Sequence, residues 1–500
     1  MFYPCGMSLT LNGSVGSQNT RPVSPPPKPR APANKETHVA FQTAAGVELR
    51  GPLGRMMRHS ATFEIYSPKT ILSTSEALTE FSINFQGKVI YFGRAVIRSL
   101  VETGGKMVCD VALDEQRWLA VDLQASDNAR ENAANEFGKF LQEWQKIYIV
   151  SPEFKIAVSD MQTFFRELRI WLNQLELQTQ PAYQVHDGRE SEITLQLAAL
   201  AVPAINALFE KFEAVAKELG SDQRAAYASY MRQNLHPLVL CAPFASRTFQ
   251  KPRGYAGDYE MVNMIIRNGF EGDSLFAKIL HFWFVSQPPA EAHRNRIAYL
   301  VAAIQRENLR LSRLSRPMRV FNFACGPAAE VQKFLQTCPF PADLHFTLAD
   351  FDQETLEFAR RFLRANKALP QSELKLNFRK MSVLQLIKEA RKSVQAEADG
   401  FDLVYCAGLF DYLPDNTCKD LMDIFYDLLA PGGLLIATNV EESNPLRYGM
   451  EYLLDWHLIY RNDKNLLDIR PQNAELDEVC VRADDTGVNL FLEVRKPLHE

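Results

Sequence analysis

The stretch MRVFNFACGPAAE (residues 318–330) decides the fold of the C-terminal part of the chain. A run of apolar residues, long enough for a buried strand, ends in a turn of small residues that leads into a helical segment. Four more strand-like runs follow: LHFTLAD (344–350), FDLVYCAG (401–408), GGLLIATNV (432–440) and VNLFLEVRK (488–496). Near-continuous apolar runs are typical of strands buried on both faces, so this part predicts an α/β unit with a parallel sheet.

Helical segments lie between these strands. ETLEFARRFLRANKA (354–368) and CKDLMDIFYDLLA (418–430) each have the length that a crossover between parallel strands needs. The alternation of strand and helix predicts a Rossmann-like sheet from about residue 317 onward.

The turn FNFACGPAAE (321–330) is a candidate ligand site. Such a turn lets the backbone approach a nucleotide-like ligand and points helix N–H groups at its polar end. A turn that only packs a strand against a helix is the alternative, because Ala324 and Ala328 stand where a glycine-rich turn has glycines. Asp350 ends the second strand, 24 positions after Gly326, where an acid can accept hydrogen bonds from both hydroxyls of a ribose.

Three elements in this order resemble the class I S-adenosylmethionine-dependent methyltransferases. They are the turn at 321–330, LAD at 348–350, and FDLVYCAGLFDYLPD (401–415) followed by LLAPGGLLIATN (428–439). The resemblance covers about residues 317–500 and implies an enzyme with S-adenosylmethionine as its cofactor. The final GVNLFLEVRK (487–496) is similar to the antiparallel seventh strand of that family's sheet, which favours this interpretation over a dinucleotide dehydrogenase with NAD.

The resemblance also implies which residues hold the cofactor. These are Phe323, Ala324, Cys325 and Gly326 for the methionine part, Asp350 for the ribose, Phe351 for the adenine face, and Ser382 with Val383 for the adenine edge. Ala407 and Gly408 would line the site of methyl transfer. The sequence departs from the family pattern where Asn322 replaces the usual acid, Ala324 the first glycine, and Ser382 a frequent acid.

Two further segments are rich in aromatic and polar residues. KPRGYAGDYEMVNMII (251–266) precedes the sheet, and RYGMEYLLDWHLIYRN (447–462) follows it. This composition suits a pocket wall better than a simple linker. Both segments resemble methyltransferases that make the methyl ester of 3-hydroxypalmitic acid. The resemblance implies a small acid or lipid-like acceptor, such as a 3-hydroxy fatty acid.

Roles at the acceptor follow as hypotheses. Tyr255, Asp258 and Trp456 are the candidate substrate-binding residues. A carboxylate needs no general base near neutral pH, so Tyr412 or His457 would orient it, whereas His457 would be the base for a hydroxyl acceptor. A purely structural histidine is the equal alternative. Asp411, Asp415 and Asp455 form no recognisable ligand set, so no metal ion is expected.

The N-terminal part predicts a small antiparallel barrel between residues 38 and 125. Its alternating runs are ATFEIY (61–66), FSINFQG (81–87), KVIYFGRAVIRSLV (88–101) and KMVCDVAL (106–113). They resemble the PilZ-type barrel, a module that often binds cyclic di-GMP, and Arg50, Arg55 and Arg58 are suitably basic for its phosphates. The family's paired arginines are four positions apart, however, whereas Arg55 and Arg58 are three apart. The family's Asp/Asn-x-Ser-x-x-Gly motif is also absent from the next strand. We therefore expect a structural or protein-contact barrel.

The remaining segments complete the organisation. Residues 1–37 form a proline-rich tail that we expect to be disordered. Residues 126–248 predict a helical region, with NEFGKFLQEWQKIY (135–148), SDMQTFFRELRIWLNQLELQ (159–178) and AINALFEKFEAVAKEL (204–219) as amphipathic helices. Residues 249–500 are then the methyltransferase domain with its N-terminal cap segments.

Composition limits the classes of function. The 500 residues carry 55 basic and 60 acidic side chains, a net charge of -5, so no global positive field draws the chain to nucleic acid. No signal peptide is evident, and no stretch approaches about 18 uninterrupted apolar residues. The eight scattered cysteines form no CxxC pairs, and a cytoplasmic protein with reduced thiols is expected. A regulatory protein with an inactive methyltransferase-like domain is the competing interpretation.

Overall fold

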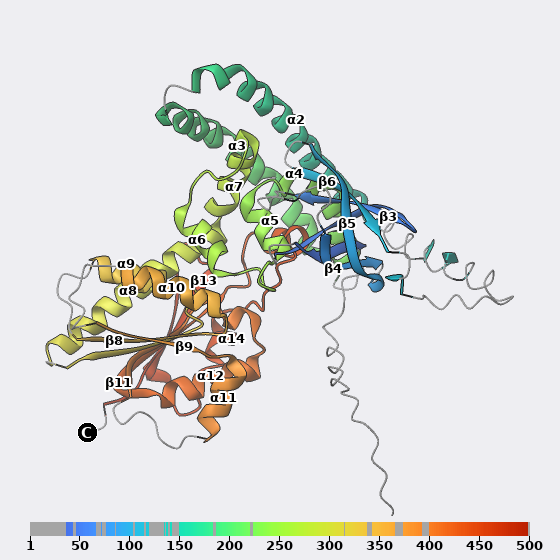
Figure 1. Ribbon diagram of the computed structural model, residues 1–500. Helices are drawn as coiled ribbons and strands as arrows, with labels where there is room; N and C mark the ends of the chain where they lie inside the picture. The colour runs from blue at the N-terminus through green and yellow to red at the C-terminus, as the bar shows by residue number, and fades with distance from the viewer. Residues whose placement is uncertain are drawn as a thin grey trace, which may run out of the picture.

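The computed structural model describes the following residues: 37–43, 47–66, 72, 77–85, 87–103, 106–114, 117–119, 135, 137–138, 141–142, 150–183, 187–220, 224–314, 316–337, 343–365, 374–392 and 400–498. The predicted proline-rich tail and most of the helix predicted at 135–148 lie outside them. Figure 1 shows a barrel, a set of helices and an α/β unit, in this order along the chain.

The N-terminal part is a closed antiparallel barrel, as the alternating runs predict. Its strands are β1 (His38–Gln42), β2 (Glu48–Met57), β3 (Ser60–Tyr66), β4 (Ala77–Phe85), β5 (Lys88–Thr103) and β6 (Lys106–Leu113), in the order β1-β2-β3-β6-β5-β4. Phe41, Phe63 and Phe81 fill the interior, with ring centroids 5.3 to 5.9 Å apart. The sequence pattern did not single out β1 and β2, and Gly51, Pro52 and Gly54 within β2 hide its alternation.

The middle part is helical, as predicted. Its helices are α2 (Pro152–Tyr183), α3 (Asp187–Lys217), α4 (Arg224–Val239), α5 (Pro243–Gln250), α6 (Tyr259–Arg267), α7 (Leu275–Ser286) and α8 (Pro288–Ser312). In Figure 1, α2 and α3 form a long hairpin at the top of the molecule. The amphipathic stretch 159–178 lies within α2 and buries Met161, Phe165 and Leu172 in the core of this part, so it packs inside the protein.

One described segment, Glu192–Lys217 of α3, has the length and apolar composition of a membrane span. Only 28% of its most apolar window is buried. Ile205, Phe209 and Phe212 nevertheless belong to the same core as α2 and α7. One face of α3 therefore packs in the core of the helical part.

The C-terminal part is a seven-stranded sheet. Its strands are β7 (Met318–Phe323), β8 (Leu344–Asp350), β9 (Leu374–Lys380), β10 (Phe401–Cys406), β11 (Leu429–Val440), β12 (Val479–Ala483) and β13 (Asn489–Arg495), in the order β12-β13-β11-β10-β7-β8-β9. The strands β7 to β11 pair in parallel, and β13 is antiparallel to β11, as predicted. β12 is a partly exposed edge strand that the sequence analysis missed.

Helices cover both faces of this sheet (Figure 1). They include α9 (Ala329–Thr337), α10 (Gln353–Ala365), α11 (Val383–Lys392), α12 (Asp415–Asp427) and α14 (Asp463–Leu467). The helix α13 (Arg447–Leu453) packs instead against α3 and α4 of the helical part. The helices α8, α9 and α10 bury apolar side chains against one face, and α11, α12 and α14 against the other. The alternation of strand and helix therefore gives the three-layered α/β unit that the sequence predicted.

The three parts are joined by specific hydrogen bonds. The Tyr66 carbonyl at the end of β3 accepts hydrogen bonds from Ser246 Oγ and Gln250 Nε2 on α5, at 3.4 and 3.2 Å. The Glu213 carboxylate on α3 accepts the N–H groups of Tyr448 and Gly449, at 3.1 and 2.7 Å. Burial raises the pKa of Glu213 to about 7. The helical part is thus fastened both to the barrel and to α13, which follows the central sheet strand β11.

Candidate active site

A cavity of about 490 Å³ lies where the sheet meets the helical part. Its floor comes from residues that follow β7, β8 and β10, which end at the same edge of the sheet. Its other walls include residues of α3, α5, α6, α7, α8 and α13 and of the loop between α5 and α6. Ligands of open α/β sheets bind outside the carboxyl ends of the strands, so the position is that of a binding site.

The turn after β7 keeps a glycine-like backbone despite its alanines. Ala324, Gly326 and Ala328 all have positive φ values, of 58°, 52° and 51°. The left-handed conformation costs an alanine about 1–2 kcal/mol, which the surrounding fold sustains. A Cβ atom placed on Gly326 would meet no atom within 4 Å, because this position faces open space. Ala324, Cys325 and Gly326 line the cavity.

Asp350 holds this turn in place from the end of β8. Its Oδ2 accepts a hydrogen bond from the Gly326 N–H at 3.1 Å, and its Oδ1 accepts one from the Asp352 N–H at 3.0 Å. The residue is only 5% exposed and lines the cavity. Burial raises the pKa of its carboxyl group, although the backbone hydrogen bonds oppose this shift.

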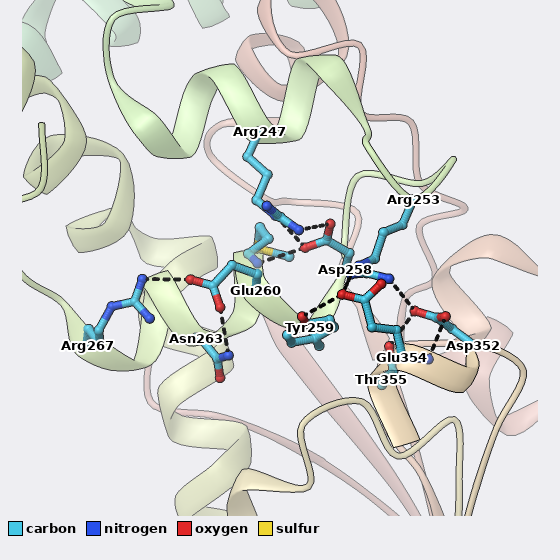
Figure 2. A network of polar contacts seen from close by, with 11 residues as sticks. Arg247, Arg253, Asp258, Tyr259, Glu260, Asn263, Arg267, Asp352, Glu354 and Thr355 are labelled. Atoms are coloured by element: carbon cyan, nitrogen blue, oxygen red, sulfur yellow. Dashed lines mark hydrogen bonds and ion pairs between the residues drawn. The ribbon is translucent and has the colours of Figure 1, made fainter. Parts of the chain in front are cut away.

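Two aromatic rings stand beside Asp350. Phe351 is half-exposed and lies 5.4 Å from the ring of Tyr255, and both line the cavity. Arg253, in the same loop as Tyr255, pairs with Asp352 at 3.0 Å and also with Glu354 (Figure 2). The loop before α6 is thereby fixed to the start of α10, and Tyr255 is held over the end of β8.

The segment after β10 forms the next part of the wall. Ala407 and Gly408 line the cavity, and the Gly408 N–H donates to Thr438 Oγ1 at 3.0 Å. The Tyr412 hydroxyl accepts a hydrogen bond from Trp456 Nε1 at 2.9 Å. The structure thus brings Tyr255, Tyr412 and Trp456 to one cavity from three distant stretches of sequence.

Two predicted acceptor residues do not line this cavity. Asp258 is fully buried as the N-cap of α6, where it accepts the Met261 N–H at 2.9 Å and pairs with Arg247 (Figure 2). The His457 side chain is 65% exposed and hydrogen-bonded to Asp455 at 3.2 Å. Neighbouring side chains of an extended segment point to opposite sides, so with Trp456 turned inward, His457 points outward. Its position therefore argues against the role of acceptor-orienting residue or base.

Three predicted cofactor residues also lie outside the lining. Phe323 is buried in the core between the sheet and α12. Ser382 Oγ accepts the Gln385 N–H at the start of α11, and Val383 begins that helix. The Met381 N–H donates to the Asp350 carbonyl at 2.8 Å, so this segment adjoins Asp350 without reaching the cavity.

The three aspartates considered as metal ligands have other partners. Asp411 accepts the Val440 N–H, Asp415 pairs with Arg461, and Asp455 pairs with Lys251. In the part of the chain that the structure describes, no three His, Cys, Asp or Glu side chains gather as metal ligands do.

Glu330 is a cavity residue that the sequence analysis missed. It is buried in the first turn of α9, and its Oε1 accepts hydrogen bonds from Asn322 Nδ2 at 2.9 Å and from the Tyr405 hydroxyl at 2.8 Å. Burial raises the pKa of its carboxyl group. Asn322 replaces the family's usual acid, and Glu330 places a carboxyl group directly beside it. The signal in the sequence was an acid eight positions after Asn322.

Arg296 on α8 is the second missed residue. It is 8% exposed and lines the cavity, and an ideal Cβ on Gly408 would lie 2.9 Å from its Nη1. Burial lowers the pKa of this guanidinium. Arg296 stands four residues after Ala292 and four before Leu300, both buried on the same helix face. A charged residue within an apolar helical stripe was the signal for it.

Comparison with known proteins agrees with this geometry. Residues 321–435 match a family model described as "Methyltransferase domain". The matched segment runs from within β7 to within β11 and includes the turn at Gly326, Asp350 and Gly408. A search of curated protein sequences found no significant match.

Solved structures with some similarity include three bacterial proteins. A possible exported protein from Bordetella parapertussis is 16% identical to this chain, with a TM-score of 0.36. The match covers 60% of this chain and 97% of that protein. The N-methyltransferase NodS of Bradyrhizobium japonicum, solved with S-adenosyl-L-homocysteine, is 18% identical with a TM-score of 0.27, over 42% and 89%. The magnesium protoporphyrin IX methyltransferase of Synechocystis is 13% identical with a TM-score of 0.31, over 47% and 93%. Similarity this low does not bear on function. The match to the family model carries the comparison: residues 321–435, which contribute to the floor of the cavity, are similar to a methyltransferase domain.

Proposed function

We propose that the protein is an S-adenosylmethionine-dependent methyltransferase whose acceptor is a small acid, such as a 3-hydroxy fatty acid that becomes its methyl ester. One observation carries this proposal. A single cavity joins the turn at Gly326 and Asp350 to a chamber walled by apolar side chains of the helical part. A donor and an apolar acceptor can therefore lie end to end inside one enclosure.

The cofactor end fits S-adenosylmethionine in shape and in chemistry. The Asp350 carboxylate suits the ribose hydroxyls, and the rings of Phe351 and Tyr255 suit the adenine. The open space at Gly326 leaves room for the methionine part. Glu330 and Asn322 place polar groups on the same side of the cavity.

The acceptor end fits an apolar chain. Its walls include the following side chains: Phe209, Phe244, Ile265, Trp283, Phe284 and Leu454. These residues come from α3, α5, α6 and α7 and from the segment after α13. A chamber with many apolar and few polar groups suits an acyl chain with one polar end.

Catalysis then consists mainly of positioning and exclusion of water. When bound, S-adenosylmethionine supplies a methyl group on a positively charged sulfur. Burial raises the pKa of the Tyr412 hydroxyl above its ordinary value, so this group stays protonated. Because it already accepts a hydrogen bond from Trp456, its own O–H is oriented and can donate to an acceptor oxygen. A carboxylate acceptor is ionised near neutral pH and requires no general base.

We expect longer 3-hydroxy fatty acids to be better substrates than short ones. Each methylene that enters the apolar chamber adds up to about 0.8 kcal/mol of binding, or up to about fourfold in kcat/KM. The test is transfer of a labelled methyl group from S-adenosylmethionine across a series of chain lengths. Turnover of a protein or nucleic acid, and of no fatty acid, would disprove the acceptor class and leave the methyltransferase assignment intact.

We expect the barrel not to bind cyclic di-GMP at micromolar concentrations. Arg50 pairs with Glu48 at 3.3 Å on the surface of β2, and the arginines at 50, 55 and 58 can attract phosphate without fixing the guanine bases. Titration of the full chain at moderate salt measures this. Tight, saturable binding that Arg55→Ala abolishes would show that the barrel is a receptor for this nucleotide.

The cytoplasmic location stays a prediction from composition. The barrel is proposed to act as a structural or protein-contact module, which agrees with its hydrogen bonds to α5.

A further inference from the structure

The Arg296 guanidinium has an unusual environment. It is buried and faces the cavity, yet no hydrogen bond or ion pair joins it to any other residue that the structure describes. A buried charge without a partner is costly, and a chain that retains one commonly has a ligand for it.

The two nearest acids do not provide that partner. Asp411 and Glu330 act on Arg296 through space but form no ion pair with it. Asp411 directs its Oδ1 to the Val440 N–H at 2.7 Å. Glu330 is engaged by Asn322 and by Tyr405. The acids lower the cost of burying the positive charge and leave its N–H groups available to the cavity.

The position of the guanidinium identifies the kind of ligand. Its Nη1 lies 2.9 Å, and its Nη2 3.2 Å, from the place of an ideal Cβ on Gly408. Both nitrogens therefore lie against the segment after β10, in the same cavity as the turn at Gly326 and the apolar side chains of the helical part. A planar guanidinium with two adjacent N–H groups matches the geometry of a carboxylate.

We propose that Arg296 is a carboxylate-binding residue inside the cavity, an inference that depends on the proposed function. Two carboxylates come within the chemistry of that function: the one on the acceptor and the one on the methionine part of the cofactor. On an acceptor, the apolar tail would extend along α7 and α8, where Trp283, Phe284 and Ala290 line the same cavity. A carboxylate oxygen held by one N–H keeps a free lone pair, so binding leaves it able to accept a methyl group.

The experiment compares Arg296→Met, which removes the charge and keeps an apolar stem, with Arg306→Met as the control. Arg306 is an exposed residue of the same helix, outside the cavity lining. Calorimetry measures the affinities of four probes on the full chain. S-adenosylhomocysteine carries the cofactor's carboxylate and 5′-methylthioadenosine lacks it; 3-hydroxyhexadecanoic acid carries an acceptor carboxylate and hexadecane-1,3-diol lacks it.

We expect Arg296→Met to lower the affinity for one of the two acids by at least tenfold. The affinity for the carboxylate-free counterpart of that acid should not change. Selective loss of the fatty acid assigns the site to the acceptor, and selective loss of S-adenosylhomocysteine assigns it to the cofactor. The melting temperature should not fall, because the variant removes a buried charge that pairs with none of the residues the structure describes. Unchanged affinity for both acids would overturn the inference.

The proposed function is tested separately by the same titrations. If the wild-type chain does not bind S-adenosylhomocysteine, that function fails. The titration with the fatty acid is also run without any nucleotide. Loss of that binding in Arg296→Met, but not in Arg306→Met, would still identify Arg296 as a carboxylate site, whereas equal affinities of the two variants for both acids would refute it.

Discussion

Replacing Asp350 with alanine is expected to weaken the binding of S-adenosylmethionine by about 1.5–3 kcal/mol, or roughly 10- to 150-fold. The variant removes the carboxylate proposed to accept hydrogen bonds from the ribose. It also removes the acceptor that holds the Gly326 N–H at 3.1 Å, so the turn loses its support from β8. Both effects act on the cofactor end of the cavity. The dissociation constant of the cofactor should therefore rise even when no acceptor is present.

Calorimetric titration with S-adenosylhomocysteine measures this change. Asp350→Asn retains a carbonyl oxygen without the charge and should give an intermediate affinity. Asp420→Ala, at an exposed position on α12, is the matched control and should bind as the wild type does. If folded Asp350→Ala bound as tightly as the control, the assignment of Asp350 to the cofactor would be wrong.

Replacing Gly326 with valine is expected to abolish cofactor binding while the melting temperature changes little. A Cβ at this position points into open space, so the protein itself has room for a larger side chain. The branched side chain would occupy the volume that the cofactor's methionine part needs. The backbone, with φ at 52°, adds strain of at least about 1–2 kcal/mol. In a large domain a change of this order moves the melting temperature by only a few degrees.

Gly326→Ala separates the two effects. Ala324 and Ala328 already have similar backbone angles, so alanine at 326 introduces strain without much bulk. We expect this variant to retain most of the affinity that valine loses, as measured by the same titration and a thermal melt. A Gly326→Val variant that still binds would show that the turn does not contact the cofactor.

The architecture was predictable because its determinants are local. Strands buried on both faces are visible as apolar runs, and β7, β8, β10 and β11 were found within a few residues of their ends. β12 was missed because it is a short edge strand that buries little, so its five residues, VCVRA, form no long apolar run. β1 and β2 were missed because glycine and proline interrupt the alternation that marks the other barrel strands.

The candidate site was predictable at one end only. The turn at Gly326 and the acid at Asp350 follow directly from consecutive strands, so spacing along the chain places them together. The other end is built from helices whose sequences carry ordinary core patterns, such as the stretch around Trp283. Composition identified the segment 447–462 as a wall but could not tell that Trp456 turns inward and His457 outward. Arg296 required the fold, because only the fold shows that no other side chain among the described residues pairs with it.

The most direct test of the central claim is a calorimetric titration of the full wild-type chain with S-adenosylhomocysteine, followed by the same titration with NAD. The cavity at Gly326, Asp350 and Phe351 predicts saturable binding of one S-adenosylhomocysteine per chain and no saturable binding of NAD. Folded protein that gives no saturable heat with S-adenosylhomocysteine, or that binds NAD instead, would contradict the proposal of an S-adenosylmethionine-dependent methyltransferase.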